Sequence, residues 1–126
     1  MYKLFKKRKL EILSRFDKRA IFLGPANANS FGQESLGLKQ VRGNGILILT
    51  ERELFFGMFI PRKDLLIPLN LINKIDIVKS HLGKTKGRKL LKVFFINNNG
   101  KQDSIAWLVK DLESWTRMLA NKLDLF

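Results

Sequence analysis

From residue 36 to residue 108 the sequence is a succession of short apolar runs separated by turn-forming residues. Gly43-Asn44-Gly45 and Asn97-Asn98-Asn99-Gly100 are typical of tight turns, because Asn and Gly tolerate positive φ. Pro68 cannot donate to a ladder, so its strand should lie at a sheet edge or end there. This spacing predicts an antiparallel sandwich or barrel of about seven strands. The expected strands are 38–41, 46–50, 53–60, 65–69, 72–79, 90–96 and 102–108.

A single amphipathic helix is predicted after the last strand. Leu112, Trp115, Leu119 and Leu123 recur at helical spacing, and Asp111 is placed to cap the first turn. One such helix after a small barrel would close an open end of the sheet with its apolar stripe. We therefore expect Trp115 to be a core residue rather than a ligand-stacking one.

The first 19 residues are interpreted as a basic amphipathic segment ahead of a domain over residues 20–126. A helix is predicted over residues 2–18, with an apolar stripe and most lysines off that stripe. The stripe either packs on the chain's own domain or a partner subunit, or lies in a membrane interface. A short strand is expected at 20–23, and a turn-rich loop or irregular edge at 24–35. The stripe comprises Tyr2, Phe5, Ile12, Leu13 and Phe16.

The formal net charge of +13 is concentrated in two places. Residues 1–19 carry eight Lys or Arg against two acidic residues, and residues 79–92 carry six Lys or Arg and no acidic residue. Such clusters attract polyanions: anionic lipid headgroups, nucleic acid or an acidic protein face. The candidate anion-binding or membrane-binding residues are Lys3, Lys6, Lys7, Arg8, Lys9, Lys84, Lys86, Arg88 and Lys89.

Gly83-Lys84-Thr85 looks like the end of a nucleotide-binding P-loop, but its surroundings exclude that function. The motif needs a glycine five residues before its own and a helix directly after it, because backbone amides and the helix N-terminus hold the phosphates together. Here Val78 occupies the upstream position, and residues 90–96 have the pattern of a strand. We therefore interpret residues 80–89 as a cationic hairpin loop between two strands.

Catalytic and metal-binding functions find little support in the sequence. The chain has no Cys and one His, and a metal site normally needs several such ligands. Ser80, His81 and Asp103 are the residue types of a hydrolase triad, but no nucleophile-elbow pattern accompanies them, and adjacent strand residues point to opposite faces. We expect Ser80 and His81 to make local hydrogen bonds in the loop. We expect no enzymatic activity, no cofactor and no metal.

Seven strands followed by one capping helix resemble the pleckstrin-homology-like (PH-like) superfold, which includes GRAM domains. Several short segments also resemble uncharacterised bacterial proteins of this kind, and the similarity covers roughly residues 32–120. The resemblance implies a barrel capped by the C-terminal helix. It also implies that the domain binds phosphoinositides or proteins. The segments are Val41-Arg42-Gly43-Asn44-Gly45, Leu49-Thr50, Ile67-Pro68-Leu69, Ser80-His81-Leu82-Gly83-Lys84-Thr85 and Asp103-Ser104-Ile105-Ala106-Trp107.

Three binding functions follow from these features. The first is peripheral association with an anionic membrane, which requires the two basic patches to share a face, since each Lys or Arg near such a surface contributes only ~1 kcal/mol. The second is protein interaction or self-assembly, including homo-oligomers, through sheet edges and the N-terminal stripe. Nucleic-acid binding is disfavoured, because the basic loop from residue 79 to residue 89 contains no aromatic residue for base stacking. No apolar run approaches the ~18 residues of a membrane-spanning helix, so we expect a cytoplasmic protein, at the inner face of the membrane under the first hypothesis.

Overall fold

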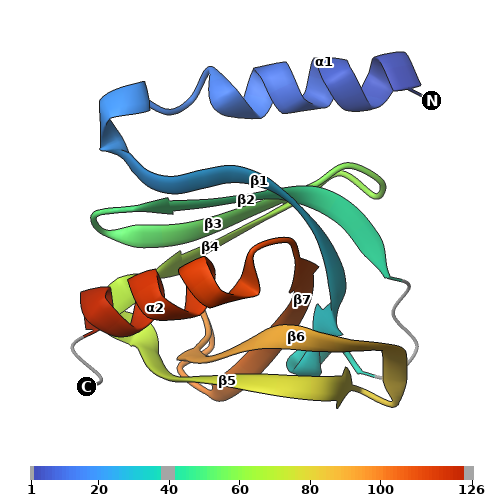
Figure 1. Ribbon diagram of the computed structural model, residues 1–126, viewed down its shortest axis with the longest axis vertical. Coiled ribbons are helices and arrows are strands. Elements are labelled where there is room, and N and C mark those ends of the chain that lie inside the picture. The colour runs from blue at the N-terminus through green and yellow to red at the C-terminus, as the bar shows by residue number, and fades with distance from the viewer. Residues whose placement is uncertain (1, 38–41, 124–126) are drawn as a thin grey trace.

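The computed structural model describes residues 2–37 and 42–123, and the side chains of these residues except 2–4, 85 and 86. Within these ranges, seven antiparallel strands form one curled sheet in the order β4-β3-β2-β1-β7-β6-β5, with one α-helix before it and one after it (Figure 1). The predicted mainly β fold is confirmed. The strands are β1 (Ile21–Gln33), β2 (Gly43–Thr50), β3 (Glu53–Met58), β4 (Lys63–Pro68), β5 (Ile72–His81), β6 (Lys84–Ile96) and β7 (Gln102–Val109).

Strand β1 lies at the centre of the sheet and allows it to curl. Its first part pairs with β2 and its last part with β7, and the register is irregular near both ends. Such irregularities bend a strand and increase its twist. The loop or irregular edge predicted at 24–35 was therefore wrong: the segment is mostly strand, followed by the 3-10 turn Glu34–Leu36. Gly24 and Gly32, with φ of 96° and 109°, lie near these irregularities within the strand.

Of three other predicted elements, one lies on residues that the structure does not describe, and two turns or loops are strand instead. The strand expected at 38–41 lies outside the described residues. The tight turn expected at Gly43-Asn44-Gly45 is instead the start of β2, where both glycines pass close to side chains and backbone of β3. The cationic loop expected at 80–89 is mostly strand, because β5 and β6 continue to a two-residue turn, Leu82-Gly83. The φ values of 51° and 73° at this turn match a type I′ hairpin, in which both central residues have positive φ.

Two predictions about the ends of the sheet are confirmed. Helix α2 (Leu112–Leu123) contacts β5, β6 and the 3-10 turn Leu69–Leu71, and it covers one end of the curled sheet (Figure 1). Trp115 and Leu119 on this helix are 2% and 0% exposed and belong to the main core. β4 is the first strand in the sheet order, and it is an edge strand that ends at Pro68, as predicted for the strand that contains this proline.

Helix α1 (Tyr2–Leu13) is shorter than the helix predicted over residues 2–18. After its last residue the backbone hydrogen bonds tighten to three-residue spacing. Asp17 then accepts a hydrogen bond from the backbone N–H of Arg19 at 3.0 Å and starts a separate 3-10 turn, Lys18–Ala20. Capping by an aspartate at this point explains why the predicted periodicity does not continue as one helix.

Candidate functional site

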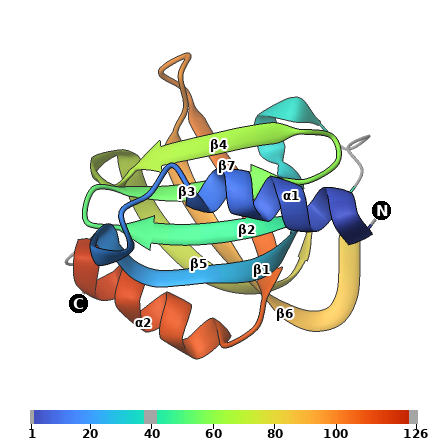
Figure 2. The same cartoon turned by 90° about the horizontal axis from the view of Figure 1, so that it is seen from above.

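Helix α1 packs on the outer face of the sheet, over β2 and β3, between β4 on one side and β1 on the other (Figure 2). Ile12 is fully buried here against Ile46, Ile48 and Phe55. Gly57 provides the space, because a Cβ at that position would lie 2.5 Å from Ile12 Cδ1. Full burial of an isoleucine side chain stabilises by about 1.5–3 kcal/mol. Of the two interpretations of the N-terminal stripe, packing on the chain's own domain is therefore the one seen in the structure.

The N-terminal half of α1 is held by an aromatic contact. The rings of Phe5 and Phe59 are stacked, with centroids 5.0 Å apart and an interplanar angle of 25°. Phe59 follows directly after β3, and its backbone N–H donates to the carbonyl oxygen of Asn44 at 2.9 Å. An offset aromatic pair is worth about 0.5–1.5 kcal/mol beyond its buried area. The contact thus fixes this half of the helix to the ends of β2 and β3.

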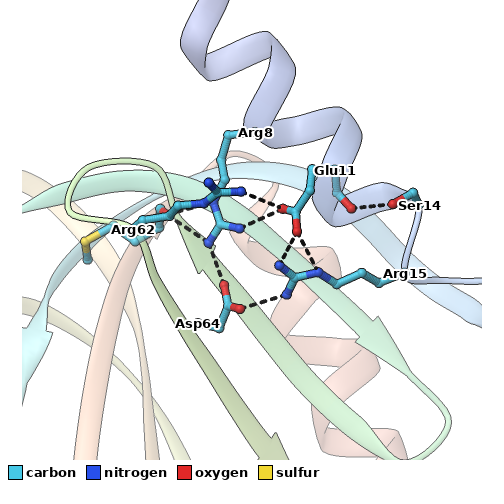
Figure 3. A network of polar contacts seen from close by, with 7 residues as sticks. Arg8, Glu11, Ser14, Arg15, Arg62 and Asp64 are labelled. Atoms are coloured by element: carbon cyan, nitrogen blue, oxygen red, sulfur yellow. Dashed lines mark hydrogen bonds and ion pairs between the residues drawn. The ribbon is translucent and has the colours of Figure 1, made fainter.

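A network of ion pairs fixes α1 on its β4 side (Figure 3). Arg8 Nη2 lies 2.5 Å from Asp64 Oδ1, and Arg8 Nη1 lies 2.8 Å from Glu11 Oε2. Arg15 bridges the same two carboxylates, with Nη1 2.7 Å from Asp64 Oδ2. Arg8 also donates to the carbonyl oxygen of Met58 at 3.3 Å. The result is that the Arg8 side chain is only 7% exposed.

The network lowers the pKa of both carboxyl groups. The hydrogen bond from Arg15 is the largest cause for Glu11, and Arg8 adds to it. For Asp64, burial acts to raise the pKa, but hydrogen bonds from Arg15 and Arg8 outweigh burial and lower it. Arg8 was among the candidate anion-binding residues, yet its guanidinium is already bound to carboxylates of its own chain. We therefore leave Arg8 out of the candidate surface.

Other cations around α1 lie next to exposed apolar side chains. Lys6 and Lys7 are exposed, and Lys9 is half-buried. Leu10 on the same helix is 60% exposed, and Ile60 in the β3–β4 turn is 53% exposed, which places both among the most exposed large apolar side chains described. Arg62, in the same turn as Ile60, lies 3.5 Å from Glu11 Oε2, but unlike Arg8 it is 65% exposed. An exposed pair of this kind is weak, so we keep Arg62 as a cation of this surface. We call these residues together the α1 surface: Lys6, Lys7, Lys9, Leu10, Ile60 and Arg62.

Two grooves flank the N-terminal half of α1. The groove on the β1 side has a volume of about 650 Å³ and is bordered by Lys6, Lys9 and Leu10. The groove on the β4 side has a volume of about 300 Å³ and passes Lys7, Ile60, Arg62 and part of the ion-pair network. Phe5 and Phe59 line both grooves, so the two grooves meet at this aromatic pair.

The second basic region lies apart from the first. The β5–β6 hairpin is at the opposite end of the long axis of the molecule from α1 (Figure 1). Arg88 and Lys89 are exposed there, and Lys84 is half-buried. The side chains of Lys3 and Lys86, also predicted as candidates, lie outside the described part of the chain. The structure therefore brings together Lys6, Lys7 and Lys9 but not the two patches.

His81 and Asp103 make hydrogen bonds to residues near the end of β1 that are far from them in the sequence. His81 is 3% exposed, and its Nε2 lies 2.7 Å from the carbonyl oxygen of Gly32 on β1. The local loop hydrogen bond predicted for His81 was therefore wrong. Burial lowers the pKa of His81, and the hydrogen bond to Gly32 only partly offsets this effect. Asp103, 2% exposed, accepts hydrogen bonds from Gln33 Nε2 at 2.7 Å and from the N–H of Ser35 at 2.9 Å.

Sequence reasoning missed three members of the α1 surface: Leu10, Ile60 and Arg62. Leu10 carried a usable signal, because it is a large apolar residue that lies off the apolar stripe of the predicted helix. Ile60 and Arg62 flank Pro61 between two strands, and only the folded β3–β4 hairpin brings them beside α1. Their role depends on a tertiary contact that no local pattern indicates.

Comparison with known proteins adds no family to this description, because neither a protein-family model nor a curated protein matches the chain. In the part of the chain that the structure describes, no helix combines the length and the apolar character needed to cross a bilayer. Function must therefore be argued from the residues of the α1 surface and their surroundings.

Proposed function

We propose that the chain is a non-enzymatic, PH-like binding domain of the bacterial, GRAM-like kind, which associates peripherally with anionic membranes at the cytoplasmic face. The α1 surface is the observation that carries this proposal. There, exposed Leu10 lines one groove with Lys6, and exposed Ile60 lines the other with Lys7 and Arg62. Exposed apolar residues rimmed by cations are typical of helices that lie in a membrane interface. The central β1, the strand order and the covering helix α2 support the PH-like assignment.

Magnitudes favour a contact that uses both charge and apolar insertion. Four cations at ~1 kcal/mol each supply about 4 kcal/mol, which is about millimolar binding. Leu10 and Ile60 are 60% and 53% exposed, so their insertion removes roughly half of each side chain from water. It adds about 2 kcal/mol, because full burial of each is worth about 1.5–3 kcal/mol. The sum, about 6 kcal/mol, corresponds to a dissociation constant on the order of 0.1 mM or tighter. The domain would therefore bind membranes reversibly.

This proposal uses one basic patch instead of two. A membrane lying against α1 meets one end of the long axis, while the β5–β6 hairpin is at the other end (Figure 1). Charge on the hairpin then contributes mainly to long-range attraction, which salt screens over about 10 Å at 0.1 M. The membrane-binding contribution of Arg88 and Lys89 should accordingly be small.

Vesicle flotation with matched charge reversals tests the proposal. The probes are vesicles of phosphatidylcholine alone and of phosphatidylcholine with phosphatidylglycerol, across a salt series. We expect recruitment to the anionic vesicles only. The double variant Lys6→Glu with Lys7→Glu should reduce binding at least 30-fold, because two attractive contributions of ~1 kcal/mol are lost. Arg88→Glu with Lys89→Glu changes the net charge equally and should bind within about threefold of the parent.

Two results would contradict the proposal. Equal recruitment to neutral and anionic vesicles at low salt would rule out the proposed association with anionic membranes. An equal loss in the two double variants would mean that only the total charge attracts the vesicles, and the α1 surface would then have no special role. Circular dichroism of both variants shows that each retains the fold of the parent.

A second function, protein interaction or self-assembly, is favoured by the edges of the sheet. β4 and β5 are the outermost strands, and each carries an exposed apolar residue, Leu66 at 49% and Ile77 at 42%. An edge strand can pair with a strand of another chain. Light scattering over a concentration series tests this function in the absence of lipid. A monomer at every concentration would count against self-assembly and would leave the membrane proposal unaffected.

A further inference from the structure

The groove between α1 and strands β1 and β2 points to a specific ligand, and we propose that it binds one anionic phospholipid drawn from the membrane surface. The phosphate would lie at Lys6 and Lys9, and the first part of an acyl chain would lie along Leu10 and Leu13. This inference rests on the proposed function and makes it more specific. It distinguishes a domain that holds one lipid molecule from a domain attracted to charge alone.

Helix geometry places the required groups on one side of α1. Lys6, Lys9, Leu10 and Leu13 are spaced by three or four residues, so they form one stripe, and all four line the groove. The stripe that packs on the sheet, with Phe5 and Ile12, lies beside it, and Leu13 belongs to both stripes. Cations at the N-terminal end of the groove stripe and leucines toward its C-terminal end give the groove an amphipathic wall.

The volume and polarity of the groove fit part of a lipid molecule. Its volume of about 650 Å³ lies within the range of about 300–1,000 Å³ typical of small-molecule sites. Phe5 and Phe59 add aromatic surface, which suits an acyl chain. Asn27 on β1 and Asn44 on β2 also line it, and side-chain amides can donate hydrogen bonds to ester carbonyl groups.

The charge of the groove selects an anion. Of the described residues that line it, two are cationic, Lys6 and Lys9, and none is acidic. Neither lysine forms an ion pair with a described carboxylate, whereas Arg8 and Arg62 beside the opposite groove pair with Glu11. The β1-side groove therefore offers cations that are available to a phosphate. The quaternary ammonium of a zwitterionic phosphatidylcholine would be repelled by the two lysines, and a phosphate without chains would lose the apolar contacts.

Short-chain lipids that stay monomeric allow the groove to be tested without a membrane. The probe is dihexanoyl phosphatidylglycerol below its micelle concentration, titrated into the full chain by isothermal titration calorimetry. The comparison ligands are dihexanoyl phosphatidylcholine, with the same chains, and glycerophosphoglycerol, with the same headgroup. We expect saturable binding of one dihexanoyl phosphatidylglycerol per chain. Both comparison ligands should bind at least tenfold more weakly.

A variant that fills the groove without changing charge separates this inference from the proposed function. Asn27 is exposed on β1, so Asn27→Phe should keep the fold while its ring occupies the groove. It should reduce binding of dihexanoyl phosphatidylglycerol at least tenfold, yet still float with anionic vesicles within about threefold of the parent. Asn73→Phe, at an exposed position on β5, is the matched control and should bind the short-chain lipid like the parent.

The results discriminate clearly. Equal affinity for glycerophosphoglycerol, or unchanged binding by Asn27→Phe, would overturn the groove inference even where anionic vesicles still recruit the protein. Conversely, failure of flotation with intact binding of the short-chain lipid would overturn the membrane function and keep the groove. Thermal melting verifies that Asn27→Phe is folded. If it is not, Leu10→Gln at a 60% exposed position provides the second test, with an expected loss of about threefold or more.

Discussion

The two basic regions of this chain have the same surplus of six cations in the sequence, but the fold uses that charge differently. Around α1, Arg8 and Arg15 are bound by Glu11 and Asp64, and they hold the helix on the sheet. Residues 79–92, around the turn of the β5–β6 hairpin, contain no acidic residue. A count of charges in the sequence therefore indicates whether a region attracts a polyanion. It does not indicate which of the cations are free of carboxylate partners in the fold and can contact that polyanion.

The regions differ equally in how their backbone is fixed. α1 depends on tertiary contacts: the buried Ile12, the Phe5–Phe59 stack and the ion-pair network. The hairpin depends on strand pairing and on a two-residue turn, Leu82-Gly83. Substitutions at α1 should thus change global stability, whereas substitutions near the hairpin turn should have small and local effects.

Removing the buried contact of α1 should have the largest effect. Ile12→Ala should lower the free energy of unfolding by about 3 kcal/mol, because large-to-small changes at fully buried positions typically cost 2–5 kcal/mol. Ile77→Ala on β5 is the matched control, and its 42% exposure leads us to expect a change within about 1 kcal/mol. Urea denaturation measures both. Similar losses in the two variants would mean that α1 does not share the core of the domain.

Arg8 and Arg88 form a pair that tests the ion-pair network directly. Arg8→Ala removes the buried member of the network and leaves Arg15 as the shared partner of Asp64 and Glu11. Removal of one member of a buried pair costs about 3–5 kcal/mol when no other partner remains. Asp64 and Glu11 are 39% and 37% exposed, so solvent reduces this cost, and we expect about 2 kcal/mol. Arg88→Ala at an exposed position should stay within about 0.5 kcal/mol. Equal effects in urea denaturation would show that Arg8 acts only as a surface charge.

This pair of arginines also shows where sequence reasoning ends. The strand runs between residues 46 and 108, α2 and the core position of Trp115 were predicted correctly, because helical spacing and short apolar runs are local signals. The burial of Arg8 was not predictable, because its partner Asp64 is 56 residues away and belongs to another element. Lys6, Lys7 and Lys9 could be named from the sequence, but their separation from the hairpin depends on the topology of the sheet.

β1 shows a second physical reason for failure. Gly24, Pro25 and Gly32 have the composition of a turn, and the segment from 24 to 35 was predicted as a loop for that reason. In the structure the same residues belong to a long, bent strand. Glycine and proline disturb pairing both at the end of a strand and at a bulge within one, so their presence alone does not distinguish the two cases.

Acid should lower the free energy of unfolding through groups in the two regions, and it should do so at different pH values. The pKa of His81 is lowered from its ordinary value of 6.5 by burial. As the pH falls, His81 therefore binds a proton in the unfolded chain before it does so in the folded chain. The stability from neutral His81 is present above about pH 6.5 and is lost as the pH falls through the lowered pKa. Gly32 and Glu34 oppose this shift, while Lys92 and Lys84 add to it.

Glu11 and Asp64 respond at lower pH, because their folded-state pKa values lie below the ordinary values of 4.5 and 3.8. Their contribution is present above those values and is lost as the pH falls through the lowered ones. Urea denaturation from pH 8 to pH 3 should therefore show two losses of stability. His81→Gln should remove the first, and Arg8→Ala should diminish the second. A single loss below pH 4.5 that is the same in His81→Gln would refute the assignment to His81.

The smallest expected effect lies at the hairpin turn and tests its local origin. Leu82 has a φ of 51°, which is unfavourable for leucine, and Gly83 follows with a φ of 73°. Leu82→Asn creates the Asn-Gly pair preferred in type I′ turns and should raise the free energy of unfolding by about 0.5 kcal/mol. Leu82→Ala, which removes the same side chain without the preference for positive φ, should give no gain. If both variants lose stability equally, the packing of the half-buried Leu82 outweighs its backbone strain, and the hairpin would then resemble α1 in depending on side-chain contacts.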